Sequence, residues 1–158
     1  MGLFKKDKKQ APSVRPIKAK IKPLNYPPKI ILGWAKAIEG NKEISEWLSK
    51  NGYEELTVAC WAIRLKNDAR NWLMQNGYPH LMAFIHAAEG DEKAINWLKN
   101  NHFHLFYNMA LAIDGENENM IWLRQHATPD IFILMQSIKK VKDDIEANHN
   151  DMHSFSKD

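Results

Sequence analysis

Apolar positions recur along this chain with a period of 25 residues. A Trp-Leu pair occurs four times at this spacing, and all copies align without gaps. Alanines and branched apolar residues then fall into further columns. The aligned pairs are Trp47-Leu48, Trp72-Leu73, Trp97-Leu98 and Trp122-Leu123, and the alanines are Ala37, Ala62, Ala87 and Ala112. This regularity predicts an array of equivalent units in which the four tryptophans are structural packing residues.

Each unit has the pattern of two short helices joined by a turn. In the first unit, apolar residues at 31, 34, 35 and 38 share one helix face, and those at 44, 47 and 48 follow. Gly40 and Asn41, between the two runs, are typical of a helix end and of the cap of the next helix. Helices of about ten residues are too short to be stable alone in water, so neighbouring units must pack together.

The pattern therefore predicts an all-α fold, a right-handed α-α superhelix forming a short solenoid. We expect four 25-residue helix-turn-helix repeats and a C-terminal capping helix from Pro129 to about Glu146. The expected organisation is an extended, basic, Pro/Lys-rich N-terminal arm (1–29), a helical repeat domain (30–146) and a flexible C-terminal tail (147–158). Leu24 and Tyr26 of the arm are expected to cover the exposed end of the first repeat.

Some turns depart from the pattern. The second helices of the first two units end in Asn51-Gly52 and Asn76-Gly77, where glycine can adopt a left-handed conformation. The third unit has Asn101-His102 instead. The turn inside the second unit has Leu65-Lys66 where the other units have glycine followed by an acidic or amide residue.

The third unit resembles the paired helices of ankyrin repeats. It carries Ala87-Ala88, then Gly90, then Trp97-Leu98 and a terminal Asn100-Asn101, where ankyrin helices carry Ala-Ala, Gly, Leu-Leu and a terminal Gly. The β-hairpin finger of ankyrin repeats and its Thr-Pro-Leu-His signature are missing. The resemblance implies a curved stack of antiparallel helix pairs whose usual work is to bind other proteins.

Charge separates the arm from the rest of the chain. Residues 1–30 hold nine lysines and arginines and one aspartate, a net charge of +8, whereas residues 31–130 hold nine basic and thirteen acidic side chains, a net charge of −4. Such an arm could dock on its own domain, an acidic partner, nucleic acid or anionic lipid. A single cysteine, Cys60, and the lack of a membrane span or secretion signal favour a cytoplasmic protein.

Residues that vary within one structural column are free to contact a partner. Two columns on the first helices, four residues apart, vary most and share one helical stripe. Tyr53, Tyr78 and Phe103, one turn earlier, either extend this stripe or pack between hairpins. The candidate partner-binding residues are Lys36, Trp61, Met82, His86, Tyr107 and Leu111.

The sequence offers little for catalysis. His102 and His104 lie two apart at a turn, but a zinc site needs three or four converging ligands. A phosphate loop, a nucleophile elbow and a Cys-His pair are missing. The acidic residues that end the first helices, Glu39, Glu89 and Asp114, suit solvated surface charge. We expect no metal, no cofactor and no enzymatic activity.

These observations favour a non-enzymatic protein-interaction module that binds a protein partner through its variable aromatic stripe. The alternative is a nucleic-acid-binding protein that uses the basic arm, although the acidic repeats argue against it. A small enzyme on a helical scaffold is a third hypothesis, which a deep polar cleft would support.

Overall fold

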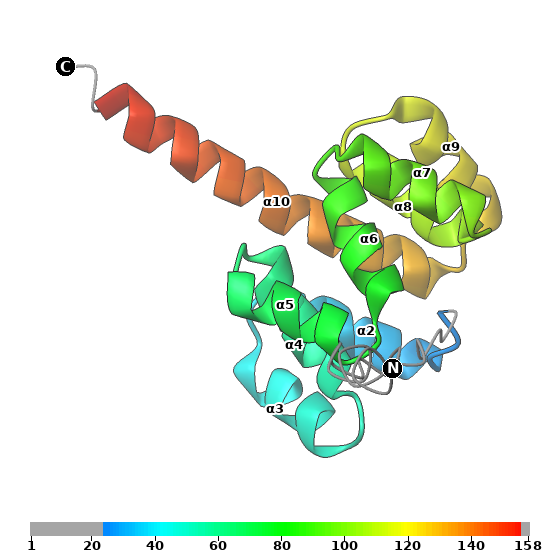
Figure 1. Ribbon diagram of the computed structural model, residues 1–158, viewed down its shortest axis with the longest axis vertical. Helices are drawn as coiled ribbons and strands as arrows, with labels where there is room; N and C mark the ends of the chain where they lie inside the picture. Colours follow the sequence, from blue (N-terminus) through cyan, green and yellow to red (C-terminus); the bar gives the residue numbers. More distant parts are fainter. Residues whose placement is uncertain (1–23, 156–158) are drawn as a thin grey trace, which may run out of the picture.

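The computed structural model describes residues 24–155, and this range contains helices and turns but no strand. The helices form pairs that follow the 25-residue period, each packed on its neighbours in sequence (Figure 1). The first helices are α2 (Pro28–Ile38), α4 (Glu54–Ile63), α6 (Pro79–Ala88) and α8 (His104–Ile113); the second helices are α3 (Lys42–Lys50), α5 (Asn67–Gln75), α7 (Glu92–Asn100) and α9 (Asn117–His126); α10 (Pro129–Phe155) follows. The all-α class is confirmed.

The two residues of each Trp-Leu pair have different roles. The leucines Leu48, Leu73, Leu98 and Leu123 are at most 1% exposed. Trp72, Trp97 and Trp122 lie at the edge of the core, whereas Trp47 is 50% exposed. Each of the four stacks on an aromatic ring at the end of the same hairpin, as Trp72 does on Tyr78 with ring centroids 6.0 Å apart. The tryptophans therefore brace hairpin ends, while the leucines hold the stack together.

The turns follow the predicted chemistry. Gly40 and Gly90 have positive φ values of 112° and 89°, a conformation that side chains disfavour. The side chain of Asn41 accepts a hydrogen bond from the Ile44 amide at 3.0 Å, and that of Asp91 accepts one from the Lys93 amide at 2.9 Å. These caps satisfy amides that the helices leave unpaired.

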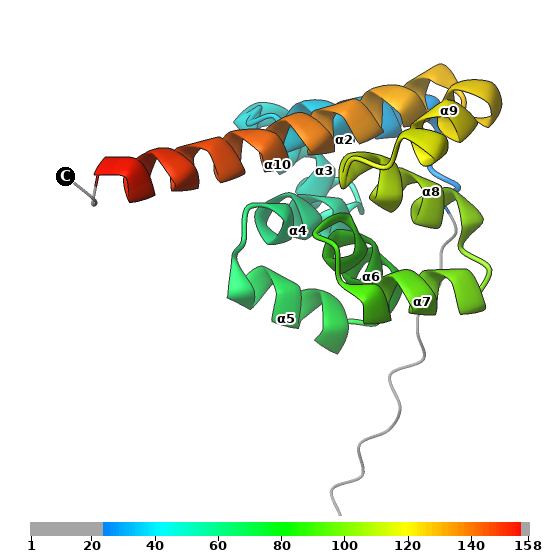
Figure 2. The ribbon, with the colours of Figure 1, turned by 90° about the horizontal axis from the view of Figure 1, so that it is seen from above.

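The last helix brings the two ends of the array together. α10 packs against α8 and also lies beside α2, pointing in the same direction (Figures 1 and 2). The Ser137 hydroxyl donates to Glu39 Oε1 at 3.1 Å, and Lys139 Nζ lies 3.5 Å from the Ile113 carbonyl oxygen. The expected capping helix thus contacts the first unit as well as the last. The right hand of the superhelix stays a prediction.

α10 is longer than the sequence pattern indicated. It continues to Phe155 instead of ending near Glu146, and its C-terminal part stands clear of the other helices (Figure 1). Most of the expected tail, 147–158, is therefore helical. The physical reason is that residues 130–155 contain neither glycine nor proline to end the helix.

The end of the arm is anchored on the second unit. Leu24 and Tyr26 pack against the core, and the Tyr26 hydroxyl donates to Glu55 Oε1 at 2.8 Å. The Tyr26 ring meets Tyr53 edge-on, with centroids 5.9 Å apart. Burial and the neighbouring Glu55 carboxylate raise the pKa of Tyr26 well above its usual value. The rest of the predicted arm, residues 1–23, lies outside the described residues.

Candidate functional site: an exposed apolar surface at the end of α4

The predicted binding residues differ widely in exposure. Lys36 and Trp61 are exposed. Trp61 has the largest apolar side chain of the six candidates and is 51% exposed. His86, Tyr107 and Leu111 are half-buried. No hydrogen bond, ion pair or ring contact in residues 24–155 joins any two of the six candidates. That the six form one binding surface stays a prediction.

Met82 is a correction to the predicted stripe, because its side chain is only 5% exposed. The equivalent residue of the second unit, Thr57, is 4% exposed and donates to the Ser45 carbonyl of α3 at 2.8 Å. In this second unit the column faces the second helix of the preceding unit. Variation in the column therefore fits packing between units, and a variable position need not be a surface position.

The aromatic residues that follow the second helices also serve packing. Tyr53, Tyr78 and Phe103 are buried or half-buried. Phe103 stacks on Trp97 with centroids 5.5 Å apart and an interplanar angle of 13°. The fourth unit has no aromatic residue at this position, and His126 stacks on Trp122 instead at 4.5 Å. Of the two interpretations of these aromatics, the structure supports packing.

Another exposed apolar residue, Leu65, lies near Trp61 and was not among the six predicted binding residues. Leu65 lies one turn further on, beyond the C-terminus of α4, and is 54% exposed. It has a φ of 67°, whereas the equivalent residues of the other three units are glycines with φ values of 112°, 89° and 106°. We call Trp61 and Leu65 together the Trp61–Leu65 surface.

The turn around Leu65 has the same hydrogen bonds as the glycine turns. The Lys66 amide donates to the Trp61 carbonyl at 3.1 Å, as the Asn41 amide does to Lys36 at 3.0 Å. Leucine therefore occupies a backbone conformation that costs a side-chain-bearing residue about 1 kcal/mol or more, and its side chain stays in water. The fold alone gives no reason to prefer leucine over glycine here.

Two hollows flank the Trp61–Leu65 surface. The first lies beside Trp61 and is lined by Lys66, Asn67, Asp68 and Ala69. The second lies between Leu65 and the C-terminal half of α10 and is lined by Ile145, Glu146, His149 and Asn150. The two exposed apolar side chains thus stand between concave surfaces with polar rims, which is the arrangement found at many protein interfaces.

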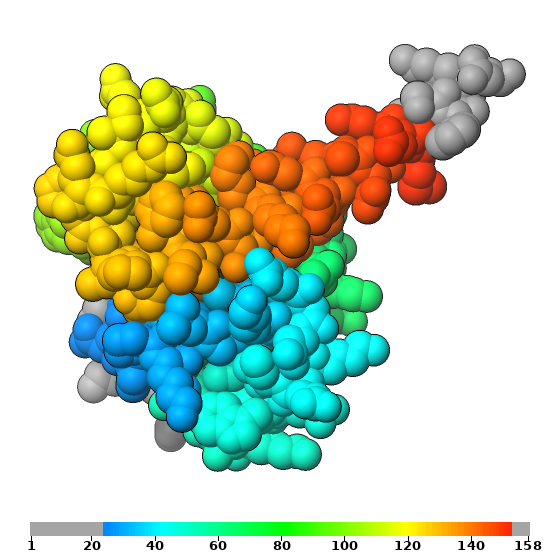
Figure 3. Space-filling view, turned by 180° about the vertical axis from the view of Figure 1, so that it is seen from behind, coloured from blue at the N-terminus to red at the C-terminus, as the bar shows by residue number. Residues whose placement is uncertain are grey.

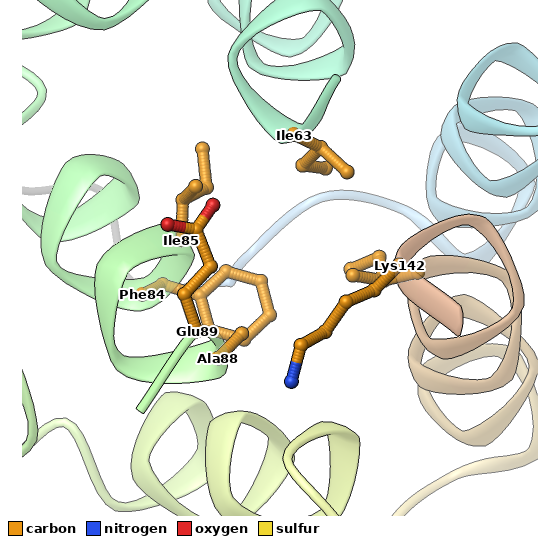
Figure 4. A pocket seen from close by; sticks show the side chains of 7 residues that line it. Ile63, Phe84, Ile85, Ala88, Glu89 and Lys142 are labelled. Atoms are coloured by element: carbon orange, nitrogen blue, oxygen red, sulfur yellow. The ribbon is translucent and has the colours of Figure 1, made fainter. Parts of the chain in front are cut away.

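The acidic residues that end the first helices are paired. Arg70 donates to both carboxylate oxygens of Glu89 and to the Ala62 carbonyl, and Lys142 lies 2.8 Å from Asp114 Oδ1. Glu89 and Lys142 also line a cavity of about 20 Å³ between α4, α6 and α10, which is otherwise apolar (Figure 4). This volume holds about one water molecule, so it is no substrate cleft. The carboxylates have a structural role in joining helices.

Two buried titratable groups lie away from the surface. Burial raises the pKa of the Cys60 thiol to about 12, so the thiolate needed for nucleophilic chemistry does not form near neutral pH. His80 is 1% exposed, and its Nδ1 has no hydrogen-bond partner. Burial lowers the pKa of His80 to about 4. Sequence reasoning did not single out His80, because histidine is polar and the neighbouring units have Glu55 and Leu105 at the equivalent position.

Within residues 24–152, no three His, Cys, Asp or Glu side chains are close enough together to hold a metal ion. The predicted histidine pair, His102 and His104, has ring centroids 5.9 Å apart and no third ligand.

No helix of the described region combines the length and apolarity needed to span a lipid bilayer. Comparisons with protein-family models, curated proteins and solved structures find no match to the chain.

Proposed function

We propose that the chain is a non-enzymatic protein-interaction module and that a partner protein binds at the Trp61–Leu65 surface. The observation that carries the proposal is Leu65. An exposed leucine in a conformation suited to glycine lowers the stability of the free protein. Such local strain is found where function requires it, and here the exposed apolar side chain would be buried only in a complex.

The chemistry around Leu65 supports binding of a protein surface. Trp61 is half exposed, and tryptophan is enriched among the residues that contribute most to binding energy. The hollows on either side offer space for apolar side chains of a partner. Lys66, Asp68 and Glu146 provide a polar rim that would exclude water from the contact.

The proposal also covers the remaining binding residues, the hand of the superhelix and the location of the protein. Lys36, His86, Tyr107 and Leu111 extend the binding surface along the first helices, and the helix pairs follow the right-handed superhelical path of ankyrin-like arrays. A cytoplasmic location fits the single buried cysteine. The 25-residue alignment supports the array, and the exposure of Lys36 supports its place at the surface.

The test compares Trp61→Ala and Leu65→Gly with the wild-type chain in quantitative pull-downs from cell extract. We expect both variants to lose the same set of captured proteins by about tenfold or more. Ile121→Ala is the matched control, because Ile121 is 46% exposed on α9. The Leu65→Gly variant should also unfold at a higher denaturant concentration, since about 1 kcal/mol of backbone strain is removed.

Full capture of those proteins by both variants would reject the Trp61–Leu65 surface. The paired readouts on Leu65→Gly separate function from folding. A variant that binds less because it is poorly folded would lose stability, whereas we expect this variant to gain stability and lose binding.

A second candidate function is nucleic-acid binding through the arm, and the observation in its favour is the net charge of +8 on residues 1–30. We expect fluorescence anisotropy with DNA and RNA to show binding that weakens steeply with salt if this function exists. Replacing Lys18, Lys20 and Lys22 by glutamine should then reduce both affinity and salt dependence. Absence of salt-sensitive binding by the full chain would reject it.

A further inference from the structure

An apolar hollow lies between α2 and α3, which Figure 3 shows in blue and cyan on one face of the molecule. We call it the α2–α3 hollow, and it is lined by Lys29, Ile30, Gly33, Ile44, Trp47 and Leu48. Its volume of about 310 Å³ is roughly ten times the share of one water molecule in the liquid, so apolar side chains fit into it. Trp47 at its edge is 50% exposed. The described residues therefore leave this apolar surface uncovered.

Gly33 keeps the α2–α3 hollow open. It lies in the middle of α2, where glycine is less favourable than alanine. The fold has room for a side chain here, because a Cβ atom at Gly33 would have its nearest contact, Ile44 Cγ2, at an ordinary distance of 3.6 Å. Packing among residues 24–155 therefore does not explain the glycine. A segment of chain that lies close against α2 at this point would explain it.

Ring contacts lead from the end of the N-terminal arm to the α2–α3 hollow. Tyr26 meets Tyr53 with centroids 5.9 Å apart, and Tyr53 stacks on Trp47 with centroids 6.4 Å apart. These two contacts keep the Tyr26 ring within about 12 Å of Trp47. The extended chain between Ile21 and Tyr26 can span about 17 Å. The residues that precede Tyr26 can therefore reach the hollow of their own chain.

The segment 17–22 has the side-chain pattern that an apolar hollow on an acidic surface would bind. Its apolar residues alternate with lysines, so in an extended conformation the two kinds point to opposite sides. The apolar residues are Ile17, Ala19 and Ile21, and the lysines are Lys18, Lys20 and Lys22. One side of such a segment can face the hollow while the other keeps its charges in water.

The surroundings of the hollow are acidic. Residues 39–55 hold five glutamates and two lysines, whereas residues 1–30 have a net charge of +8. Glu43, Glu46 and Glu54 are exposed, and none of them forms an ion pair within residues 24–155. Charge therefore attracts the lysines of the segment 17–22 to this part of the molecule.

We propose that residues 17–22, which lie outside the described residues, bind in an extended conformation across the α2–α3 hollow of the same chain. Ile17 and Ile21 contact the apolar lining, and Ala19 passes close to Gly33. The lysines between them reach toward the unpaired glutamates around the hollow. The lining of the hollow shares no residue with the Trp61–Leu65 surface, so this contact is independent of the proposed partner site.

A nitroxide label on the arm tests this contact in the full chain. It is attached through Lys20→Cys, and Cys60 stays unlabelled because it is buried. We expect the indole N–H signal of Trp47 to lose most of its intensity in the heteronuclear NMR spectrum, relative to the same sample with the nitroxide reduced. The indole signal of Trp122 should keep its intensity, because α3 and α9 lie at opposite ends of the body (Figure 1).

Matched variants separate docking from the tether at Tyr26, which by itself keeps the label in the neighbourhood. Ile17→Ser together with Ile21→Ser removes the apolar contacts and changes no residue of α2 to α10, whereas Gly33→Leu fills the hollow. Both changes should restore most of the Trp47 signal. Ser49→Leu adds the same side chain at an exposed position of α3 outside the hollow and should restore none. Circular dichroism checks that each variant keeps its helices.

Three results would overturn the proposal. The first is a Trp47 signal that keeps its intensity in the nitroxide-labelled chain. The second is a loss of intensity that persists after Ile17→Ser and Ile21→Ser. The third comes from a mixture of isotope-labelled chain without nitroxide and nitroxide-labelled chain without isotope. A weakened Trp47 signal in this mixture would show that the segment binds another copy instead of its own chain.

Discussion

At the scale of single residues, His80 is the clearest departure from an apolar core. It begins the first turn of α6 and is enclosed by aromatic rings, with the centroid of Phe103 at 5.9 Å and that of Phe106 at 6.1 Å. Its Nδ1 finds no hydrogen-bond partner. Removing water from the ring disfavours the charged form, and this desolvation is why the pKa falls.

Stability should therefore decline in acid because of His80. The folded pKa is about 4 and the usual pKa is 6.5, so the unfolded chain binds a proton more readily throughout this window. The contribution of neutral His80 is fully present above about pH 6.5 and is lost as the pH falls toward 4. The loss amounts to at most about 3 kcal/mol.

The His80→Phe variant checks this expectation by urea unfolding at a series of pH values. Its free energy of unfolding should change less than that of the wild type between pH 6.5 and pH 4, because phenylalanine does not titrate. His104→Phe is the control, since His104 is exposed. Parallel pH profiles for the wild type and His80→Phe would show that His80 does not couple folding to protonation.

At the scale of elements, the helix pairs were predictable because their signals are local. The spacing of apolar positions and the turn residues Gly40 and Asn41 are signals that span about four residues of sequence. The helices of the structure end and begin at these residues. The end of α10 was not predictable in this way. Its later turns are mostly polar, with Ile145, Met152 and Phe155 as the large apolar residues, and residues 143–155 contain no glycine or proline that would have located the end.

The candidate site depends on longer-range information. The sequence singled out Trp61 as a surface residue and Leu65 as an anomaly of its turn, and both are exposed. Met82 of the predicted stripe is buried, and the equivalent residue Thr57 donates a hydrogen bond to the preceding unit. Periodicity reveals which residues share a helix face, but it does not reveal how many faces are covered. That number depends on how neighbouring pairs pack.

At the scale of the whole molecule, the contact between α2 and α10 changes how the array should behave. A linear array exposes its first unit, and stability there depends only on the next unit. In this chain α2 packs on α4 and also on α10. The curvature needed for this closure accumulates from small rotations between units, which no single repeat specifies. For this reason the sequence predicted neighbours in the array but not the contact between its ends.

Closure predicts that a change in α10 reaches α2 directly. Ile138 is 3% exposed and lines the central cavity with Ile63 and Phe84, so Ile138→Val should destabilise the fold by about 1 kcal/mol. Native-state hydrogen exchange should then show reduced protection of amides in α2 as well as in α8, because both helices pack on α10. Ile133→Val, on the exposed side of α10, should leave both unchanged. If protection falls in α8 while α2 keeps its wild-type rates, α2 does not depend on α10, and the chain behaves as a linear array.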